Sequence, residues 1–287
     1  MKRKLIFVLG AIGVQHVCAQ QTDWTNVENV FGRKGTVQGE VFKITFPRSD
    51  LAVKVGDFAV APGLAFTSWI GVIQMEGHAM MMGDLVLLDA ELPAVTKKIM
   101  EVNLSITAIH NHLINESPGI KYIHFSGNGD AVKLSEEIKS VLQVTATPLS
   151  PASMQTSANT PDWSNVEAIL GTSGRKNGML LQYSFARNEK LQDEGMEMPP
   201  AMGMATAINF QMDGNQAAIT GDFVLLPGEV NAVAKSLTEN GITPTAVHNH
   251  MLYDEPRLFM MHFWAVGDPE KLATGLKAAL RKTNSKQ

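Results

Sequence analysis

The sequence has almost no cysteine and, beyond its first four residues, no run of basic residues. Cys18 is the single cysteine among 287 residues, and it falls in an N-terminal segment that we expect to be removed. The mature chain then contains no thiol, which excludes disulfides and thiol chemistry. Phosphate binding relies on clustered lysines and arginines, so the scattered basic residues argue against a nucleic-acid partner.

The N-terminal segment has the pattern of a secretory signal peptide. Basic residues 2–4 precede the apolar run 5–14 and a small-residue cleavage point, which predicts a signal peptide over 1–19. The apolar run is about half the roughly 20 residues that span a bilayer as a helix, so we expect no transmembrane segment in the mature protein. We expect a secreted or periplasmic chain with 21 basic and 28 acidic residues, a net charge of −7. Lipid attachment at Cys18 is the alternative, although Val17 stands where a lipoprotein signal has a small residue.

The chain repeats itself at a spacing of 138 to 139 residues. Three strings of the first half return in the second: DWTNVE at 23–28 as DWSNVE at 162–167, GDLVLL at 83–88 as GDFVLL at 221–226, and TAIHNH at 107–112 as TAVHNH at 245–250. Such self-similarity indicates two copies of one structural unit. We predict modules over 22–144 and 162–284, joined by a linker at 145–161 that is rich in Thr, Ser, Ala and Pro.

The pattern of one copy predicts an α+β fold, with a mostly antiparallel sheet and helices on one face. Asp23 is expected to cap a short helix through Phe31, and residues 47–50 resemble a turn that has no counterpart in the second copy. The remaining expected elements are strands at 37–46, 65–75, 80–88, 105–112 and 121–127, and helices at 92–102 and 130–142. We expect the two sheets to pack against each other or to join across a pseudo-twofold axis.

Histidines form the most specific pattern. Of eight in the chain, six lie in one repeated arrangement: His110, His112 and His124, with His248, His250 and His262 as their counterparts. Residues two apart on a strand point to the same face. With His110 directly opposite His124 on the next strand, all three rings of a copy share one face.

Three imidazoles on one face favour a divalent metal site, with zinc as the preferred ion, because zinc sites with catalytic roles use three protein ligands and an open position. A carboxylate follows each cluster, and Glu116, Asp254 or Glu255 could complete the shell or act as the base of a metal-dependent hydrolase. The alternative is a polar core or wet groove without metal, which fits a non-catalytic binding module for an envelope polymer or a small ligand. The pattern leaves open whether the six histidines form one shared site or two.

Two further features are less specific. The methionines of residues 80–82 and 196–204 favour copper(I) handling as a third hypothesis, because thioethers suit that ion, although methionine commonly fills gaps in cores. The pairs 83–84 and 221–222 (Gly-Asp) resemble turns before strands, and either aspartate could reach the histidine face.

The strings GDLVLL, TAIHNHL and HNHMLYDEPRLFMMHFWAVGD, the last at 248–268, resemble the LppY/LpqO family. These are duplicated exported bacterial proteins, some of them lipoproteins, that carry a domain of unknown function. The resemblance covers nearly the whole mature chain. It implies an envelope location and a duplicated fold, and it brings no catalytic roles with it.

Overall fold

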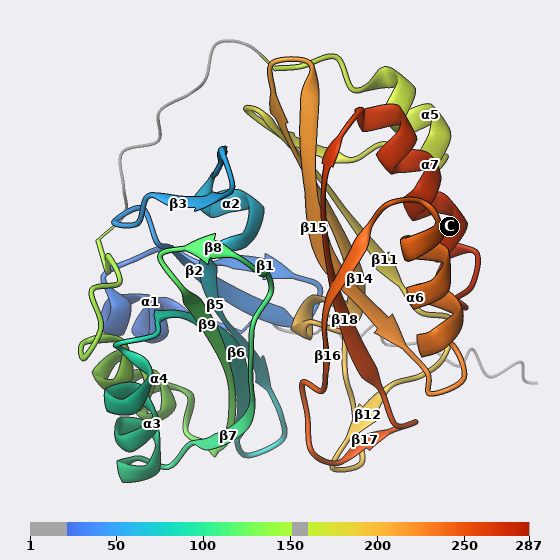
Figure 1. Ribbon diagram of the computed structural model, residues 1–287. Helices are drawn as coiled ribbons and strands as arrows, with labels where there is room; N and C mark the ends of the chain where they lie inside the picture. Colours follow the sequence, from blue (N-terminus) through green and yellow to red (C-terminus); the bar gives the residue numbers. More distant parts are fainter. Residues whose placement is uncertain (1–21, 151–159, 287) are drawn as a thin grey trace, which may run out of the picture.

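Two six-stranded antiparallel sheets lie face to face between two layers of helices in the computed structural model, which describes residues 22–150 and 160–286. The predicted signal peptide, with Cys18, lies outside the described residues. Figure 1 shows α1, α3 and α4 of the first module, and α5, α6 and α7 of the second, on the outer side of their own sheet. The prediction of an α+β fold with two homologous modules is therefore confirmed.

The first module has the sheet order β1-β2-β5-β6-β9-β7. Its elements are α1 (Thr25–Phe31), β1 (Thr36–Gln38), β2 (Val41–Pro47), β3 (Val53–Val55), β4 (Phe58–Val60), α2 (Pro62–Ala65), β5 (Thr67–Gln74), β6 (Ala79–Leu88), α3 (Leu92–Glu101), β7 (Ser105–His110), β8 (Glu116–Ser117), β9 (Ile120–Gly129) and α4 (Ala131–Leu142).

The second module repeats this plan with the order β10-β11-β14-β15-β18-β16. Its elements are α5 (Ser164–Leu170), β10 (Arg175–Asn177), β11 (Leu180–Ala186), β12 (Gln192–Asp193), β13 (Met196–Glu197), η1 (Pro200–Met202), β14 (Ala205–Asp213), β15 (Gln216–Leu225), α6 (Val230–Glu239), β16 (Thr243–His248), β17 (Asp254–Glu255), β18 (Phe259–Gly267) and α7 (Pro269–Leu280).

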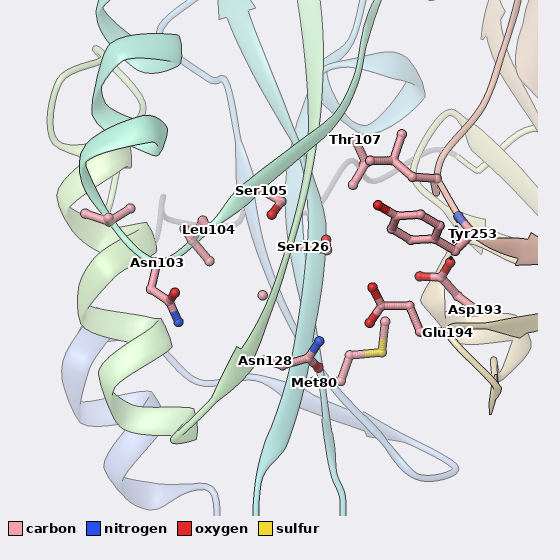
Figure 2. A pocket seen from close by; sticks show the side chains of 13 residues that line it. Met80, Asn103, Leu104, Ser105, Thr107, Ser126, Asn128, Asp193, Glu194 and Tyr253 are labelled. Carbon is pink, nitrogen blue, oxygen red and sulfur yellow. Dashed lines mark hydrogen bonds between the residues drawn. The ribbon is translucent and has the colours of Figure 1, made fainter.

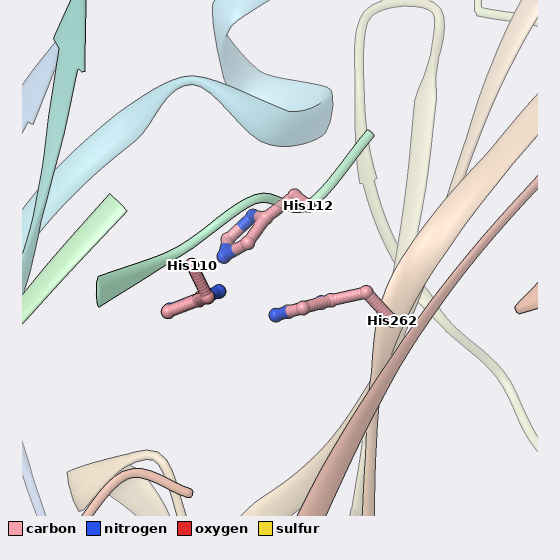
Figure 3. Close-up of side chains that lie close together, drawn as sticks. All are labelled: His110, His112 and His262. Carbon is pink, nitrogen blue, oxygen red and sulfur yellow. The ribbon is translucent and has the colours of Figure 1, made fainter. Parts of the chain in front are cut away.

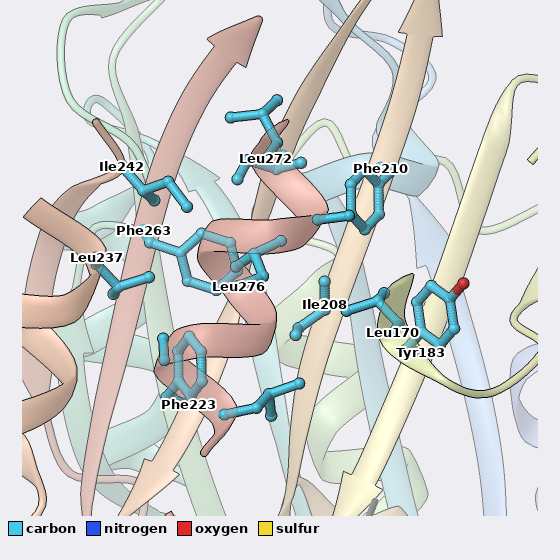
Figure 4. Packing of buried hydrophobic residues seen from close by; sticks show 14 of the residues in the cluster. Leu170, Tyr183, Ile208, Phe210, Phe223, Leu237, Ile242, Phe263, Leu272 and Leu276 are labelled. Atoms are coloured by element: carbon cyan, nitrogen blue, oxygen red, sulfur yellow. The ribbon is translucent and has the colours of Figure 1, made fainter. Parts of the chain in front are cut away.

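Each module has its own apolar core between its sheet and its helices. In the second module, Phe210, Phe223 and Phe263 project from the sheet onto Leu276 of α7 and Leu237 of α6 (Figure 4). The side chains alternate along the strands, so the opposite face of each sheet is left to meet the other module. That shared layer contains two further buried apolar clusters, one of them rich in methionine.

Several local expectations hold and others fail. Asp23 accepts the backbone N–H of Thr25 at 2.9 Å, as a helix-capping residue does. The single strand expected at 37–46 is wrong, because a turn with Gly39 at φ 63° divides it into β1 and β2. The linker expected at 145–161 begins by packing onto the first module, where the backbone of Ala146 donates to Glu91.

Residues 47–50 form the expected turn, in which the backbone N–H of Ser49 donates to the carbonyl of Pro47 at 2.8 Å. The expectation that this turn has no counterpart is wrong. Arg48 is fully buried and binds Asp50, Glu91 and a backbone carbonyl, and Arg187 of the second module has the same set of partners. A buried guanidinium needs such partners because an unpaired charge is costly away from water. Within the described residues, no helix has the length and apolar character to cross a membrane.

Candidate metal centre

Both histidine triplets lie on the sheet faces that meet between the modules. His124 on β9 pairs with Asp84 on β6, and His262 on β18 pairs with Asp222 on β15. His110 and His248 end β7 and β16, the neighbouring edge strands. Because the two sheets face each other, all six rings meet in one cluster between the modules.

The strand register differs from the expected one, with a bulge between Ile106 and Ala108. His124 lies opposite Ala108, and His110 lies opposite Tyr122. This is a shift of two residues, which preserves the face on which a side chain lies. The direct pairing of His110 with His124 was therefore wrong, while the shared face was right.

The rings contact one another across the module boundary. The centroids of His110 and His248 are 3.6 Å apart, which places this pair on the pseudo-twofold axis. His112 lies 3.8 Å from His262, and the counterpart pair, His124 and His250, is 4.1 Å apart. Figure 3 shows His110 and His112 facing His262 of the other module. Each module thus supplies rings to the other's triplet.

The two Gly-Asp pairs lie inside strands and are not turns before them. A Cβ on Gly221 would stand 2.0 Å from the carbonyl oxygen of Ala207, and one on Gly83 would stand 2.3 Å from that of Trp69. Only glycine permits this close strand approach. The glycines therefore allow the sheet to carry Asp84 and Asp222 beside the histidines.

Both aspartates contact imidazoles of their own module. The Oδ2 atom of Asp222 is 3.0 Å from Nε2 of His250, whereas that of Asp84 is 3.5 Å from Nε2 of His112 and 3.8 Å from Nε2 of His124. Asp84 and Asp222 therefore both reach the histidine face, as the sequence had suggested for either of them. The signal for them was their repeated Gly-Asp string.

Three groups of side chains have ligand atoms within 4.8 Å of one another. They are His110, His112 and His262; His110, His124 and His248; and Asp222, His248 and His250. The first two draw on both modules, and the first and third share no residue. Ligands at about 2 Å in a tetrahedron stand roughly 3.3 Å apart, so modest rotations of the side chains would close a group on an ion.

Burial disfavours the protonated form of several imidazoles in the cluster. It lowers the pKa of His110, His112 and His124, and neighbouring imidazoles lower these pKa values further. Burial and then His262 lower the pKa of His248 to about 3. A neutral imidazole keeps a nitrogen lone pair for a metal, and a protonated one has none.

The pKa values of Asp84 and Asp222 shift in opposite directions. Burial and then the charge of Asp222 raise the pKa of Asp84 well above its usual range. Burial alone would also raise the pKa of Asp222, but His262 and His250 outweigh it and lower that pKa. The closer contact between Asp222 and His250 explains this difference. Ionisation is thus favoured at Asp222 and opposed at Asp84.

Several nitrogen atoms of the cluster have no hydrogen-bond partner among the described residues. A buried polar atom without a partner is rare in proteins and costs about 1–3 kcal/mol. The unpartnered atoms are Nε2 of His110, both ring nitrogens of His124, Nε2 of His248, Nδ1 of His250 and Nε2 of His262.

The acidic residues predicted as catalytic lie in other interactions. Glu116 accepts the backbone N–H of Ile120 at 3.3 Å. Asp254 is buried, accepts the backbone N–H of Leu258 and pairs with Arg257, and Glu255 is exposed on β17. None of these three carboxylates belongs to a ligand group, and their catalytic role stays a prediction.

The asparagines between the histidines join the modules. The side chain of Asn249 donates to the carbonyl of Thr107 at 2.9 Å, and that of Asn111 donates to the carbonyl of Thr245 at 3.3 Å. Each also donates within its own loop. This reciprocal pair of hydrogen bonds fixes the two edge strands beside each other.

Comparison with known proteins identifies the family of this chain and two distantly similar solved structures. The family described as Domain of Unknown Function (DUF1259) matches the chain twice, over residues 25–144 and 164–282. No curated protein matches. One similar solved structure is the trimeric bacterial microcompartment shell protein PduB, with 12% sequence identity, 87% of this chain and 89% of that chain covered, and a TM-score of 0.22. Another is EtuB from Clostridium kluyveri, with 10% sequence identity, 87% of this chain and 89% of that chain covered, and a TM-score of 0.21. Similarity this low supports no conclusion about fold or function.

Proposed function

We propose that this chain, which belongs to the DUF1259 family, binds a divalent metal ion, with zinc preferred, in the histidine cluster that its two modules share. The observation that carries the proposal is the convergence of six imidazoles, five of which have unpartnered buried nitrogens. Neutral imidazole is a common ligand of zinc. An ion would give these nitrogens the partners that the surrounding protein does not provide, and it would link the two modules.

The donor set favours zinc over copper(I). Imidazole nitrogens and one carboxylate suit zinc, whereas copper(I) prefers sulfur. The buried methionines, among them Met80, Met82 and Met202, pack with Val41 and Ile73 in an apolar cluster. That packing accounts for the methionine-rich segments without a copper site.

A hydrolytic role for the site is the narrower extension of this proposal. A bound zinc ion would supply an activated water. The side chains of His112 and Asp222 are 18% and 15% exposed, so both are open to a substrate that enters from solvent. Asp222, beside His250, is itself a member of a ligand group, unlike the carboxylates that the sequence pattern suggested.

The proposed location is the bacterial cell envelope. The N-terminal pattern of a signal peptide and the resemblance to LppY/LpqO proteins support this. Export would place the site where metal is captured from outside the cytoplasm. Fractionation of cells that express the full-length chain tests the location, and recovery in the cytoplasmic fraction at full length would contradict it.

The metal content of the purified mature chain tests the site itself. We expect one or two zinc ions per chain after dialysis, and a fall in melting temperature when a chelator removes them, because an ion that binds the folded state stabilises it. His112→Ala and His262→Ala should lower the metal content to a similar extent, since both residues belong to one ligand group that spans the modules.

His78→Ala is the matched control, because His78 is exposed in a turn outside the cluster. Its metal content and its response to chelator should equal those of the unaltered chain. Absence of stoichiometric metal together with an unchanged melting temperature after chelation would refute the proposal. An equal loss of metal in His78→Ala would place the ion elsewhere.

A further inference from the structure

A polar cavity of about 400 Å³ opens between the modules, apart from the histidine rings, none of which lines it. Residues of the first module, among them Asn103, Ser105 and Asn128, form one wall. Glu194 and Tyr253 of the second module face them, and Figure 2 shows the Glu194 carboxylate and the Tyr253 ring directed toward the first module. Amides, hydroxyls and a carboxylate thus converge on one space.

The charge of the lining has one sign. Asp193 and Glu194 contribute carboxylates, and no lysine, arginine or histidine of the described residues lines the cavity. Asp193 is fixed in place, because its Oδ1 atom accepts the backbone N–H of Tyr253 at 3.3 Å. An anionic ligand would be repelled here, whereas a cationic group would be attracted.

Tyr253 supplies an aromatic surface to this space. Its side chain is among the most exposed large residues, at 65%, and it stands three residues after His250. In the repeat, the counterpart of Tyr253 is Asn115, so the first module has no such ring. An exposed ring bordered by carboxylates can bind the apolar face of a ligand and an adjacent cation.

Thr107 gives a second asymmetry at the same place. Its hydroxyl is buried without a hydrogen-bond partner, although the residue lines the cavity. The counterpart hydroxyl, on Thr245, donates to the carbonyl of His112. Since buried hydroxyls are normally satisfied, the free hydroxyl of Thr107 is available to a ligand group.

We propose that this cavity binds a short saccharide that carries a free amino group. The hydroxyls of the sugar would pair with Asn103, Asn128 and Thr107, which offer both donors and acceptors. The apolar face of one ring would stack on Tyr253, and the ammonium group would face Glu194. A simple polyamine would leave the hydroxyl and amide wall unused, and a neutral sugar would leave the carboxylates unpaired. This site goes beyond the metal centre and does not require it.

Calorimetric titration of the mature chain with four probes tests the proposal: a glucosamine disaccharide with free amines, its N-acetylated form, spermidine and glucuronic acid. The free-amine disaccharide should bind about 5-fold tighter than the acetylated one, a ratio typical of one partly exposed ion pair. Spermidine should bind more weakly than the disaccharide, and glucuronic acid should not bind. Metal-stripped protein should give the same order, so failure here is distinct from failure of the metal proposal.

Two variants connect the binding to the cavity. Tyr253→Ala should weaken binding of the free-amine disaccharide about 5-fold or more, and Glu194→Gln should abolish its advantage over the acetylated form. Glu197→Gln is the matched control, because Glu197 lies on the same hairpin, is exposed and does not line the cavity. Each variant is first shown to melt like the parent chain. Equal binding of the acetylated disaccharide or of spermidine, an unchanged affinity in Tyr253→Ala, or no binding of any probe would overturn the proposal.

Discussion

Replacing Arg187 by methionine is expected to destabilise the protein by about 3 kcal/mol. The guanidinium of Arg187 is fully buried, and its Nη1 atom donates to the carbonyl of Val224 at 2.7 Å and to Glu229 at 2.7 Å. Its Nε atom donates to Glu189 at 2.9 Å. Methionine fills similar space but leaves the carbonyl and both carboxylates without these donors.

The expected loss of stability follows from how deeply Arg187 and its two carboxylate partners are buried. Removing one partner of a buried ion pair costs roughly 3–5 kcal/mol. The side chains of Glu189 and Glu229 are 24% and 15% exposed, so water can partly solvate them after the substitution. The lower end of that range therefore applies.

Unfolding in urea, followed by tryptophan fluorescence, measures this loss. Arg48→Met in the first module should show a similar loss, because Arg48 has matching partners. Arg175→Met is the control at an exposed strand position and should stay within about 0.5 kcal/mol of the parent chain. A loss below about 1 kcal/mol in Arg187→Met, or one equal to that of Arg175→Met, would refute the reasoning.

The stability that the pair of Arg187 and Glu189 contributes depends on pH. The hydrogen bond from Arg187 is the main cause that lowers the pKa of Glu189, to about 2 from an ordinary value of 4.5. Since the folded-state pKa is the lower one, the pair contributes its full stability above pH 4.5 and loses it as the pH falls toward 2. The difference between Arg187→Met and the parent chain should shrink over that interval, and a constant difference would contradict this account.

Two further predictions concern the surroundings of the metal centre. Gly221→Ala should destabilise the protein by about 3 kcal/mol or more, because the new methyl group would stand 2.0 Å from the carbonyl oxygen of Ala207. Urea unfolding measures this loss of stability, with Gly228→Ala as the control, because a methyl group on Gly228 meets no atom within 4 Å. Equal stability of both variants would be evidence against the close approach of the strands at Gly221. Gln211→Ala should lower the free energy of unfolding by about 1–3 kcal/mol, because the side-chain amide of Gln211 forms hydrogen bonds with two backbone groups of the first module, each at 2.8 Å. Urea unfolding measures this loss as well. A change below about 0.5 kcal/mol would show that these hydrogen bonds do not hold the modules together.

The duplication and the histidine face could be predicted from the sequence because both rest on local regularity. A repeat of 138 residues requires no knowledge of the fold, and the two-residue period of a strand places His110 and His112 together whichever strand lies beside them. A register shift of two residues left this result intact. Long, periodic elements such as α4 were predicted for the same reason.

The remaining features depend on contacts between distant residues. The sequence pattern suggested a turn at Gly83 and Gly221, since glycine before aspartate is common in turns, whereas the glycines permit close approach of neighbouring strands. The partners of Arg48 lie up to 43 residues away, so its burial has no local signal. The meeting of His112 with His262 depends on how one sheet packs against the other.

The most direct test of the central claim is the position of the metal in a crystal of the mature chain grown with zinc. Anomalous diffraction at the zinc absorption edge should give a peak within about 2 Å of imidazole nitrogens from both modules, with His112 and His262 among the ligands. Peaks confined to surface residues, or no peak between the sheets at full zinc loading of the crystal, would contradict the account.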